Sequence, residues 1–206
     1  MATWTVDRSK ILQPDEIRRI LEDLARKGRR SLNTRMNRVI FRLACCAGLR
    51  ASEIAGLTLA DVQVDSTRPQ IRARKEITKG HKARKVPLTW DAGTLADLRD
   101  WKQFRVNQGA GADARFVCSQ HSDSLGNPLD RRNLRKRFKA CCKCLGRERQ
   151  AGLTIRHSFV SHALHGGRSV VEVQAAAGHS SLAVTSIYAH LVDTDESVGN
   201  LFNFGN

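Results

Sequence analysis

Residues 69–88 have the sequence PQIRARKEITKGHKARKVPL, and this stretch decides the fold class. Apolar and polar side chains alternate on both sides of Lys79 and Gly80, which is typical of two antiparallel strands joined by a turn. A third strand could lie at residues 61–65. Because no other part of the chain has a convincing strand pattern, we predict a mainly α protein with a small antiparallel β-sheet, of the α+β class.

Helical patterns lie on both sides of this predicted sheet. Pro14, followed by two acidic residues, predicts a helix that ends at Gly28, and a second helix follows over residues 31–48. Ser169 and Glu172 have the spacing of a capping box at the start of a later helix. The remaining predicted helices are a short turn at 52–57 and segments at 89–106, 130–145, 155–165, 169–178 and from 181 onward.

The chain is strongly basic, which limits its partners. It has 35 Lys and Arg against 20 Asp and Glu, a formal net charge of +15 and a pI near 10.4. Such a charge favours nucleic acid over a membrane, because no apolar run approaches the ~20 residues that span a bilayer. The first residues lack the pattern of a secretory signal, so we expect a cytoplasmic protein that does not bind membranes.

The six cysteines are expected to be reduced thiols. Cys141 and Cys144 have Cys-x-x-Cys spacing, but no second pair at zinc-ribbon spacing accompanies them. A zinc site is therefore less favoured than burial of the cysteines as small apolar side chains. We predict no metal and no cofactor.

Two stretches hold much of the positive charge. Residues 68–85 contain eight Lys and Arg with Glu76 as the one acid, and residues 131–150 contain nine with Glu148 as the one acid. A charge run can be only a solvated face, but two runs with so few acids favour contact with a phosphate backbone. The predicted DNA-binding residues are Arg72, Arg74, Lys75, Lys82, Arg84, Arg131, Arg132, Arg135, Lys136 and Lys139.

Tyr188 is the only tyrosine, and it lies nine residues after His179 in a Gly-His-Ser turn. A phenol, with an ordinary pKa of ~10, is a weak nucleophile unless cations and hydrogen-bond donors stabilise its anion. A phosphodiester is its natural target, because two Arg forks with a His or Lys can hold the negative oxygens of an attacked phosphate. The catalytic candidates in chain order are Arg50, Lys79, Arg156, His179 and Tyr188. Taken singly, each could be an ordinary surface or half-buried residue.

Together, the segments around these candidates resemble the catalytic domain of the tyrosine recombinase (phage integrase) family over residues 11–191. The chain contains Gly-Leu-Arg before a glutamate, a Lys-Gly turn before Val-Pro-Leu, Arg-His-Ser-Phe, Gly-His-Ser-Ser and Tyr-Ala-His, in the order of the family. The matching residues are Arg50 with Glu53, Lys79 with Arg84, Arg156, His179 and Tyr188.

The resemblance implies the DNA breaking-rejoining catalytic-domain fold and a site-specific recombinase that needs no cofactor. Tyr188 would attack a backbone phosphate of double-stranded DNA, leaving a 3'-phosphotyrosine and a free 5' hydroxyl. Arg50 and Arg156 would grip the phosphate oxygens. His179 would hydrogen-bond the same phosphate, and Lys79 would act as the general acid.

The resemblance also implies an assembly. Four copies would meet on two DNA sites, with residues 192–206 docking on a neighbouring copy. We expect residues 1–206 to form a single catalytic domain, with the N-terminal core-binding domain of the family absent.

One position departs from the family pattern. Leu153 lies three residues before Arg156, where the family usually has a His or Lys. A leucine cannot exchange protons, so we expect slower cleavage rather than none. For His157, directly after Arg156, we expect a buried structural role.

Two other functions stay open at this point. A type IB topoisomerase-like enzyme would use the same covalent intermediate but relax DNA without exchanging strands. A DNA-binding module that regulates a full recombinase would bind DNA without cutting it, and Leu153 is the feature that favours this alternative.

Overall fold

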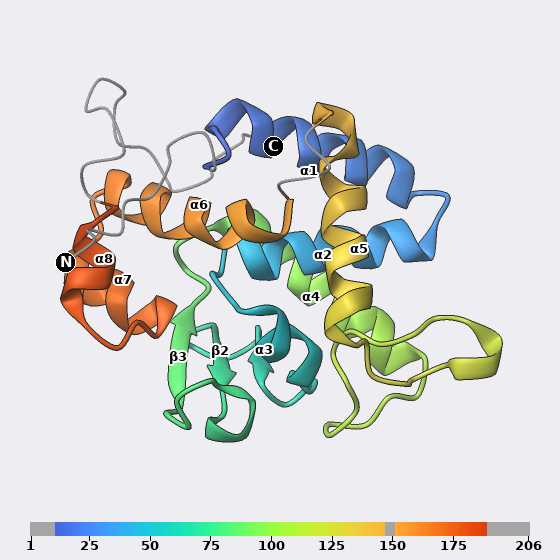
Figure 1. The fold of residues 1–206 in the computed structure, drawn as a ribbon. Helices are drawn as coiled ribbons and strands as arrows, with labels where there is room; N and C mark the ends of the chain where they lie inside the picture. The colour runs from blue at the N-terminus through green and yellow to red at the C-terminus, as the bar shows by residue number, and fades with distance from the viewer. Residues whose placement is uncertain (1–10, 147–150, 189–206) are drawn as a thin grey trace.

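The computed structural model describes residues 11–146 and 151–188, and it is mostly helical, as predicted (Figure 1). The α-helices are α1 (Pro14–Gly28), α2 (Leu32–Cys45), α3 (Ala51–Gly56), α4 (Ala92–Asn107), α5 (Arg131–Cys141), α6 (Ala151–His165), α7 (Val170–Ala177) and α8 (Leu182–Ser186). The short 3-10 helices are η2 (Lys75–Ile77), η3 (Ser122–Ser124) and η4 (Cys142–Leu145). The strands are β1 (Val62–Gln63), β2 (Gln70–Ala73) and β3 (Arg84–Pro87). Within the described residues, no helix is both long and apolar enough to cross a bilayer.

The three strands form an antiparallel sheet in the order β1-β2-β3, which confirms the predicted hairpin and its third strand. Ile71 pairs with Val62 on one side and with Val86 on the other, and all three side chains are 0% exposed. One face of the sheet therefore packs on the core, as the alternation predicts. The connection between β2 and β3 is longer than a tight turn, because residues 74–83 include η2 and carry Lys79.

Three predicted helix boundaries are wrong by several residues. α4 begins at Ala92 rather than at residue 89, because Asp91 caps it by accepting from two backbone amides of its first turn. α6 begins at Ala151, four residues before the predicted start at Ile155. α5 ends at Cys141 and continues as the 3-10 turn η4. By contrast, the predicted capping box at the start of α7 is confirmed.

Two groups of buried apolar side chains form the core. The larger group surrounds α2, which packs against α1, α4, α5 and α6. It includes most of the cysteines, and their predicted burial is confirmed except for Cys144, which is only partly buried. The smaller group lies under α6, α7 and α8 and includes Phe159, Val173 and Tyr188.

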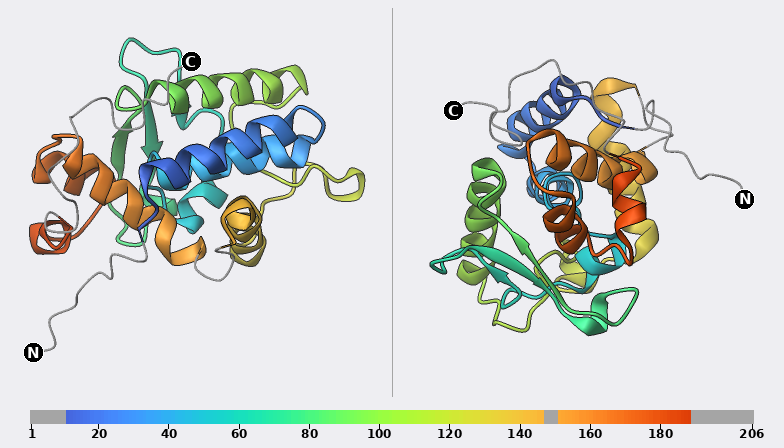
Figure 2. Two further views of the ribbon diagram at one scale, coloured as in Figure 1. Left: turned by 90° about the horizontal axis from the view of Figure 1, so that it is seen from above. Right: turned by 90° about the vertical axis from the view of Figure 1, so that its left-hand side faces the viewer.

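The smaller group places the C-terminal helices beside the sheet. α7 packs against α6 on one side and against β3 on the other. Figure 1 shows α7 next to β3, and Figure 2 shows α7 and α8 together at one end of the molecule. The turn between α7 and α8 therefore lies close to the connection that carries Lys79.

Candidate active site

The turn between α2 and α3 positions Arg50. Gly48 has a φ of 62°, and a Cβ atom there would lie 2.3 Å from the ring of Phe159, so only glycine fits. The turn leads to Arg50, the N-cap residue of α3, whose side chain is 30% exposed. It also directs the carbonyl of Gly48 to accept a hydrogen bond from Arg156. The turn thus links the two arginines that are predicted to hold a phosphate.

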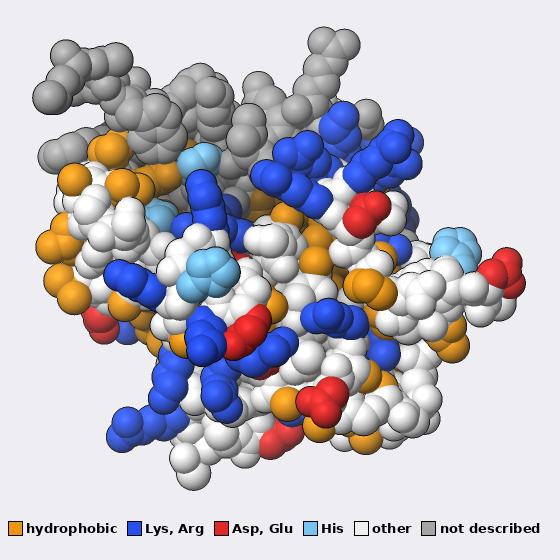
Figure 3. Space-filling view, turned by 60° about the horizontal axis from the view of Figure 1, so that its bottom comes forward, with side chains coloured by type: hydrophobic (Ala, Val, Ile, Leu, Met, Phe, Trp, Pro, Cys, Tyr) orange, Lys and Arg blue, Asp and Glu red, His pale blue; other side chains and the backbone are white. Residues whose placement is uncertain are grey.

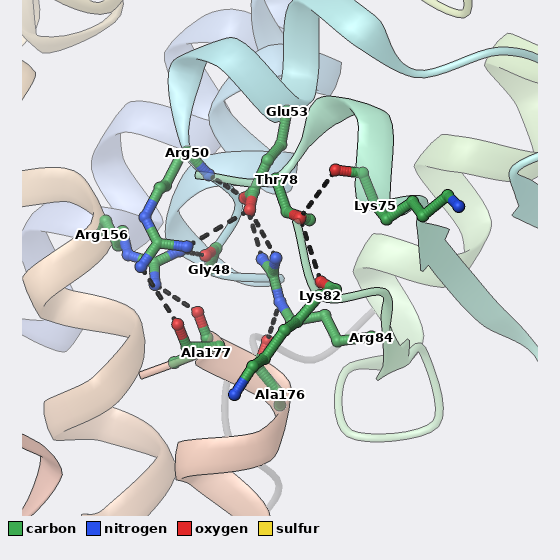
Figure 4. A network of polar contacts seen from close by, with 11 residues as sticks. Gly48, Arg50, Glu53, Lys75, Thr78, Lys82, Arg84, Arg156, Ala176 and Ala177 are labelled. Atoms are coloured by element: carbon green, nitrogen blue, oxygen red, sulfur yellow. Dashed lines mark hydrogen bonds and ion pairs between the residues drawn. The ribbon is translucent and has the colours of Figure 1, made fainter. Parts of the chain in front are cut away.

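The carboxylate of Glu53 is central to the site and is 0% exposed. It accepts from Arg84 Nη1 at 2.5 Å and Nη2 at 2.8 Å, and from the backbone amide of Arg50 at 2.6 Å (Figure 4). Arg50 Nη1 is a more distant donor, at 3.3 Å. Burial alone would raise the pKa of Glu53, but the donors of Arg84 and Arg50 hold this pKa below its ordinary value. Glu53 therefore stays ionised and holds both arginines.

Arg84, on β3, is predicted to contact DNA, but its guanidinium is directed into the protein. Its side chain is 8% exposed, and its Nε donates to the carbonyl of Ala176 at 2.8 Å. Gly178 approaches so closely that a Cβ atom there would lie 2.8 Å from Arg84 Cδ. Arg84 connects the sheet, α3 and the end of α7. It therefore holds these elements together, and its guanidinium is not exposed for contact with a DNA backbone.

Arg156, on α6, adds a third guanidinium. It donates to the carbonyls of Gly48 and Ala177. Burial first, and then the charge of Arg50, lowers the pKa of Arg156 to about 9. Arg50 and Arg84 pair with Glu53, and Arg156 interacts with the same carboxylate through its charge. Three guanidinium groups thus lie around one carboxylate, and a bound anion would offset the excess positive charge. We call this group the arginine cluster; its members are Arg50, Glu53, Arg84 and Arg156.

His179 follows α7 in a turn that begins at Gly178, which has a φ of 66°. Its Nδ1 is 2.9 Å from the hydroxyl oxygen of Thr185, which is 0% exposed. Burial, followed by the charge of Arg156, lowers the pKa of His179 to about 4, so the imidazole is neutral near neutral pH. If Nδ1 accepts from Thr185, Nε2–H is the remaining donor, which suits His179 to bind a phosphate oxygen.

Tyr188 is the last residue that the structure describes, and it is 2% exposed within the smaller core group. Its hydroxyl is 2.5 Å from Nδ1 of His157, and the two rings stack with centroids 5.6 Å apart. The ring of His179 lies 6.2 Å from the ring of Tyr188, centroid to centroid. Burial, opposed by the charge of Arg156, raises the pKa of Tyr188 to about 12. The phenol is therefore protonated in this state.

His157 makes a contact that the sequence patterns did not predict. A buried structural role was expected, but His157 is only half-buried and meets the hydroxyl of Tyr188. Its position directly after Arg156, a predicted phosphate ligand, was the one available signal, and it is a weak one because successive side chains of a helix do not face each other. Nothing local in the sequence shows that Tyr188 folds back against α6.

An open groove of about 1350 Å³ lies beside the arginine cluster. Arg50, Lys79 and His179 line it, so the structure brings three of the predicted catalytic residues to one surface. Arg156 and Tyr188 are not among the described residues that line the groove, although both neighbour His179. The predicted DNA-binding residues in the lining are Arg72, Arg74, Lys75, Lys82 and Arg84.

The loop that carries Lys79 is tied together at both sides. The hydroxyl of Thr78 is 3.2 Å from the carbonyl oxygen of Lys75 and 3.0 Å from that of Lys82 (Figure 4). At the base of the loop, Arg74 Nε donates to Asp61 at 2.8 Å. Lys79 itself is exposed, so its ammonium is presented from a fixed loop at the edge of the groove.

The second basic stretch lies on α5. The predicted DNA-binding residues there are all exposed: Arg131, Arg132, Arg135, Lys136 and Lys139. Arg137, on the same helix, instead donates to Asn37 at 2.7 Å and to Asn33 at 3.2 Å. Figure 3 shows Lys and Arg side chains gathered over much of one face of the molecule, with fewer Asp and Glu among them. This face has the charge that a phosphate backbone would need.

Two predictions concern parts of the chain that the structure does not describe: the side chain of Leu153 and residues 192–206. Among the described residues, no three His, Cys, Asp or Glu side chains are grouped as a metal site requires.

Residues 10–195 match the phage integrase family. The chain belongs to this family. The resemblance inferred from the motifs is thereby confirmed. The mainly helical fold with a three-stranded antiparallel sheet is also that of solved tyrosine recombinases.

Among the phage integrase relatives, a tyrosine recombinase XerC from Corynebacterium efficiens is 32% identical over 157 residues, which are 76% of this chain and 47% of that protein. A XerC from Shewanella amazonensis is 31% identical over 185 residues, 88% of this chain and 56% of that protein. The XerH site-specific recombinase bound to palindromic difH substrate, in a post-cleavage complex, has a TM-score of 0.70 and 25% identity, covering 88% of this chain and 49% of that one. The chain therefore spans about half the length of these relatives.

Proposed function

We propose that this chain cuts and rejoins double-stranded DNA as a site-specific recombinase, through a 3'-phosphotyrosine at Tyr188. The observation that carries the proposal is the arginine cluster, in which three guanidinium groups lie around one buried carboxylate beside His179. A phosphate has the charge and the oxygen geometry that these donors match. Family membership, and the XerH recombinase bound to its difH substrate, support DNA as the partner.

In the proposed step, each residue has one task. A guanidinium carries five N–H donors, so Arg50 and Arg156 can hold non-bridging phosphate oxygens while they also donate to backbone carbonyls. His179 donates to the same phosphate. Tyr188 attacks phosphorus, the bond to the 5' oxygen breaks, and Lys79 gives that oxygen a proton. The phosphotyrosine retains the bond energy, so a 5' hydroxyl from another duplex can reverse the step and exchange the strands.

The exposed basic residues of the groove and of α5 would contact the DNA backbone on either side of the attacked phosphate. The chain has one tyrosine, so each copy can form one covalent bond of this kind. Exchange between two duplexes requires four strand cuts. This stoichiometry supports four copies on two sites.

Leu153 supports a slower reaction, because the family usually has a proton-exchanging residue at this position. We expect Leu153→His to raise the rate of cleavage and to leave DNA binding unchanged. A rate that does not change would remove Leu153 as the cause of any slow cleavage.

The experiment that tests the function is a trapping assay. The parent chain and Tyr188→Phe are incubated with supercoiled plasmid and with pooled nicked duplexes, and protein–DNA adducts that survive denaturant are measured. Adducts formed only by the parent, with equal DNA binding by both proteins, are expected. DNA binding without any adduct would overturn the proposal, and sequencing of trapped strands would identify the site.

A further inference from the structure

Tyr188 and His157 are in contact, but the reaction proposed above gives a role only to Tyr188. The phenolic oxygen is 2.5 Å from Nδ1 of His157, and the rings are stacked at an interplanar angle of 23°. His157 also directly follows Arg156, one of the proposed phosphate ligands, on α6. A group that can exchange protons thus touches the atom that has to lose one.

We propose that His157 is the general base that takes the proton of Tyr188 as the phenol attacks the phosphate. This inference deepens the proposed function and rests on it. Leu153 occupies the position where the family usually has a His or Lys, so the proton acceptor has to come from another residue.

The burial of Tyr188 makes such a base necessary. The phenol is 2% exposed, which leaves little access for water, and burial raises its pKa to about 12. At neutral pH a phenol of this kind attacks only if its proton is removed during the step. Arg156 has no acceptor atom, and Nδ1 of His179 is already paired with Thr185. His157 is the described group whose contact geometry suits the transfer.

His157 and Lys79 together account for every proton that moves in cleavage and in rejoining. In cleavage, a bond forms between the Tyr188 oxygen and phosphorus while the bond to the 5' oxygen breaks. The phenolic proton moves to Nδ1 of His157, whose other proton is on Nε2, and Lys79 protonates the 5' oxygen. In rejoining, the His157 imidazolium returns its proton to the phenolate, and the neutral Lys79 amine takes the proton of the attacking hydroxyl.

The single tyrosine allows a first test without DNA. In protein labelled with ¹³C at the ring carbon that bears the hydroxyl, Tyr188 gives the one tyrosine resonance. We expect this resonance to shift with pH as His157 titrates, and to lose that shift in His157→Phe. Arg156 also acts on Tyr188 but remains charged in the acid range, and His179→Gln identifies the part due to His179. A pH profile that is the same in the parent and in His157→Phe would overturn the inference.

A second test separates the base from the acid. The substrate is a duplex of the trapped sequence in which sulfur replaces the bridging 5' oxygen, because a thiolate leaves without needing a proton. His157→Asn keeps a hydrogen-bonding side chain but cannot hold the proton. On ordinary DNA we expect it to cleave roughly 100-fold more slowly than the parent, within the range for general base catalysis, and to lose the fall in rate at acid pH. Sulfur should restore cleavage by Lys79→Ala but not by His157→Asn.

His165→Asn, on the same helix, serves as the matched control and should cleave like the parent. If His157→Asn also cleaves like the parent, or if sulfur restores its activity, His157 is not the base. If the parent itself forms no adduct, the proposed function fails instead, so the two failures can be distinguished.

Discussion

The arginine cluster and Tyr188 are the two halves of the proposed active site, but they are held in different ways. The cluster joins α3, α6, α7 and β3 through charged hydrogen bonds around the buried carboxylate of Glu53. Tyr188 follows α8, a helix of five residues; its hydroxyl contacts His157, its ring stacks with those of His157 and His179, and it is buried in the smaller core group. Charged hydrogen bonds between several elements thus hold the proposed phosphate-binding half, whereas ring stacking and apolar burial hold the proposed nucleophile.

The two halves also differ in their access to the groove. Arg50, Lys79 and His179 line the groove, so an anion can meet them directly. Tyr188 is 2% exposed and is not among the described residues of the lining, and its hydroxyl contacts His157 in this state.

The largest effect is expected where the cluster is most strongly held. Glu53→Gln removes the carboxylate that pairs with Arg84 and Arg50, and loss of one partner from a buried ion pair typically costs about 3–5 kcal/mol of unfolding free energy. The measurement is denaturant unfolding of the parent, of Glu53→Gln and of the exposed control Glu76→Gln. We expect a large loss only at Glu53. Equal stability of all three proteins would show that the cluster is not what fixes this half of the site.

A smaller effect, measured on the reaction, is expected for the proposed phosphate ligands. Arg50→Ala or Arg156→Ala should slow adduct formation about 100-fold, by analogy with loss of one donor to the transition state. Non-specific DNA binding should stay close to that of the parent, since many exposed bases contribute to it. Single-turnover adduct formation and filter binding measure the two quantities. Unchanged cleavage in both variants would remove these arginines from the clamp.

The sequence predicted those features of the fold and site that depend on residues close together in the chain. The strand alternation around Ile71, the capping box at Ser169 and the order of the catalytic candidates all follow from nearby residues, and the first two are present in the structure. Arg84 and His157 were interpreted differently, because their positions depend on long-range packing. Arg84 turns inward since α7 lies against β3, and the contact of His157 exists since the chain folds back on α6 after α8.

The pH dependence of stability sharpens the contrast at His179, which lies between the two halves. Its pKa of about 4 is below the ordinary histidine value of ~6.5, so the unfolded chain binds more protons between these values. The contribution of His179 is therefore fully present above pH ~6.5 and is lost as the pH falls toward about 4. His179→Gln should show a smaller fall in unfolding free energy over this interval. An equally steep fall in the variant would assign the dependence to other groups.

The smallest effects are expected at the exposed bases, and they test which surface holds the DNA. Each phosphate contact contributes about 0.9 to the slope of log affinity against log salt concentration, so Lys82→Ala in the groove and Lys136→Ala on α5 should each lower the slope by about that amount. Lys27→Ala is the control, because Lys27 pairs with Asp23 on α1, away from the sheet in Figure 1. Affinity is measured on plasmid fragments over a range of salt concentrations. If only Lys136→Ala lowers the slope, the DNA contacts α5 and does not lie in the groove. That result would contradict the groove as the surface that brings a phosphate to the arginine cluster.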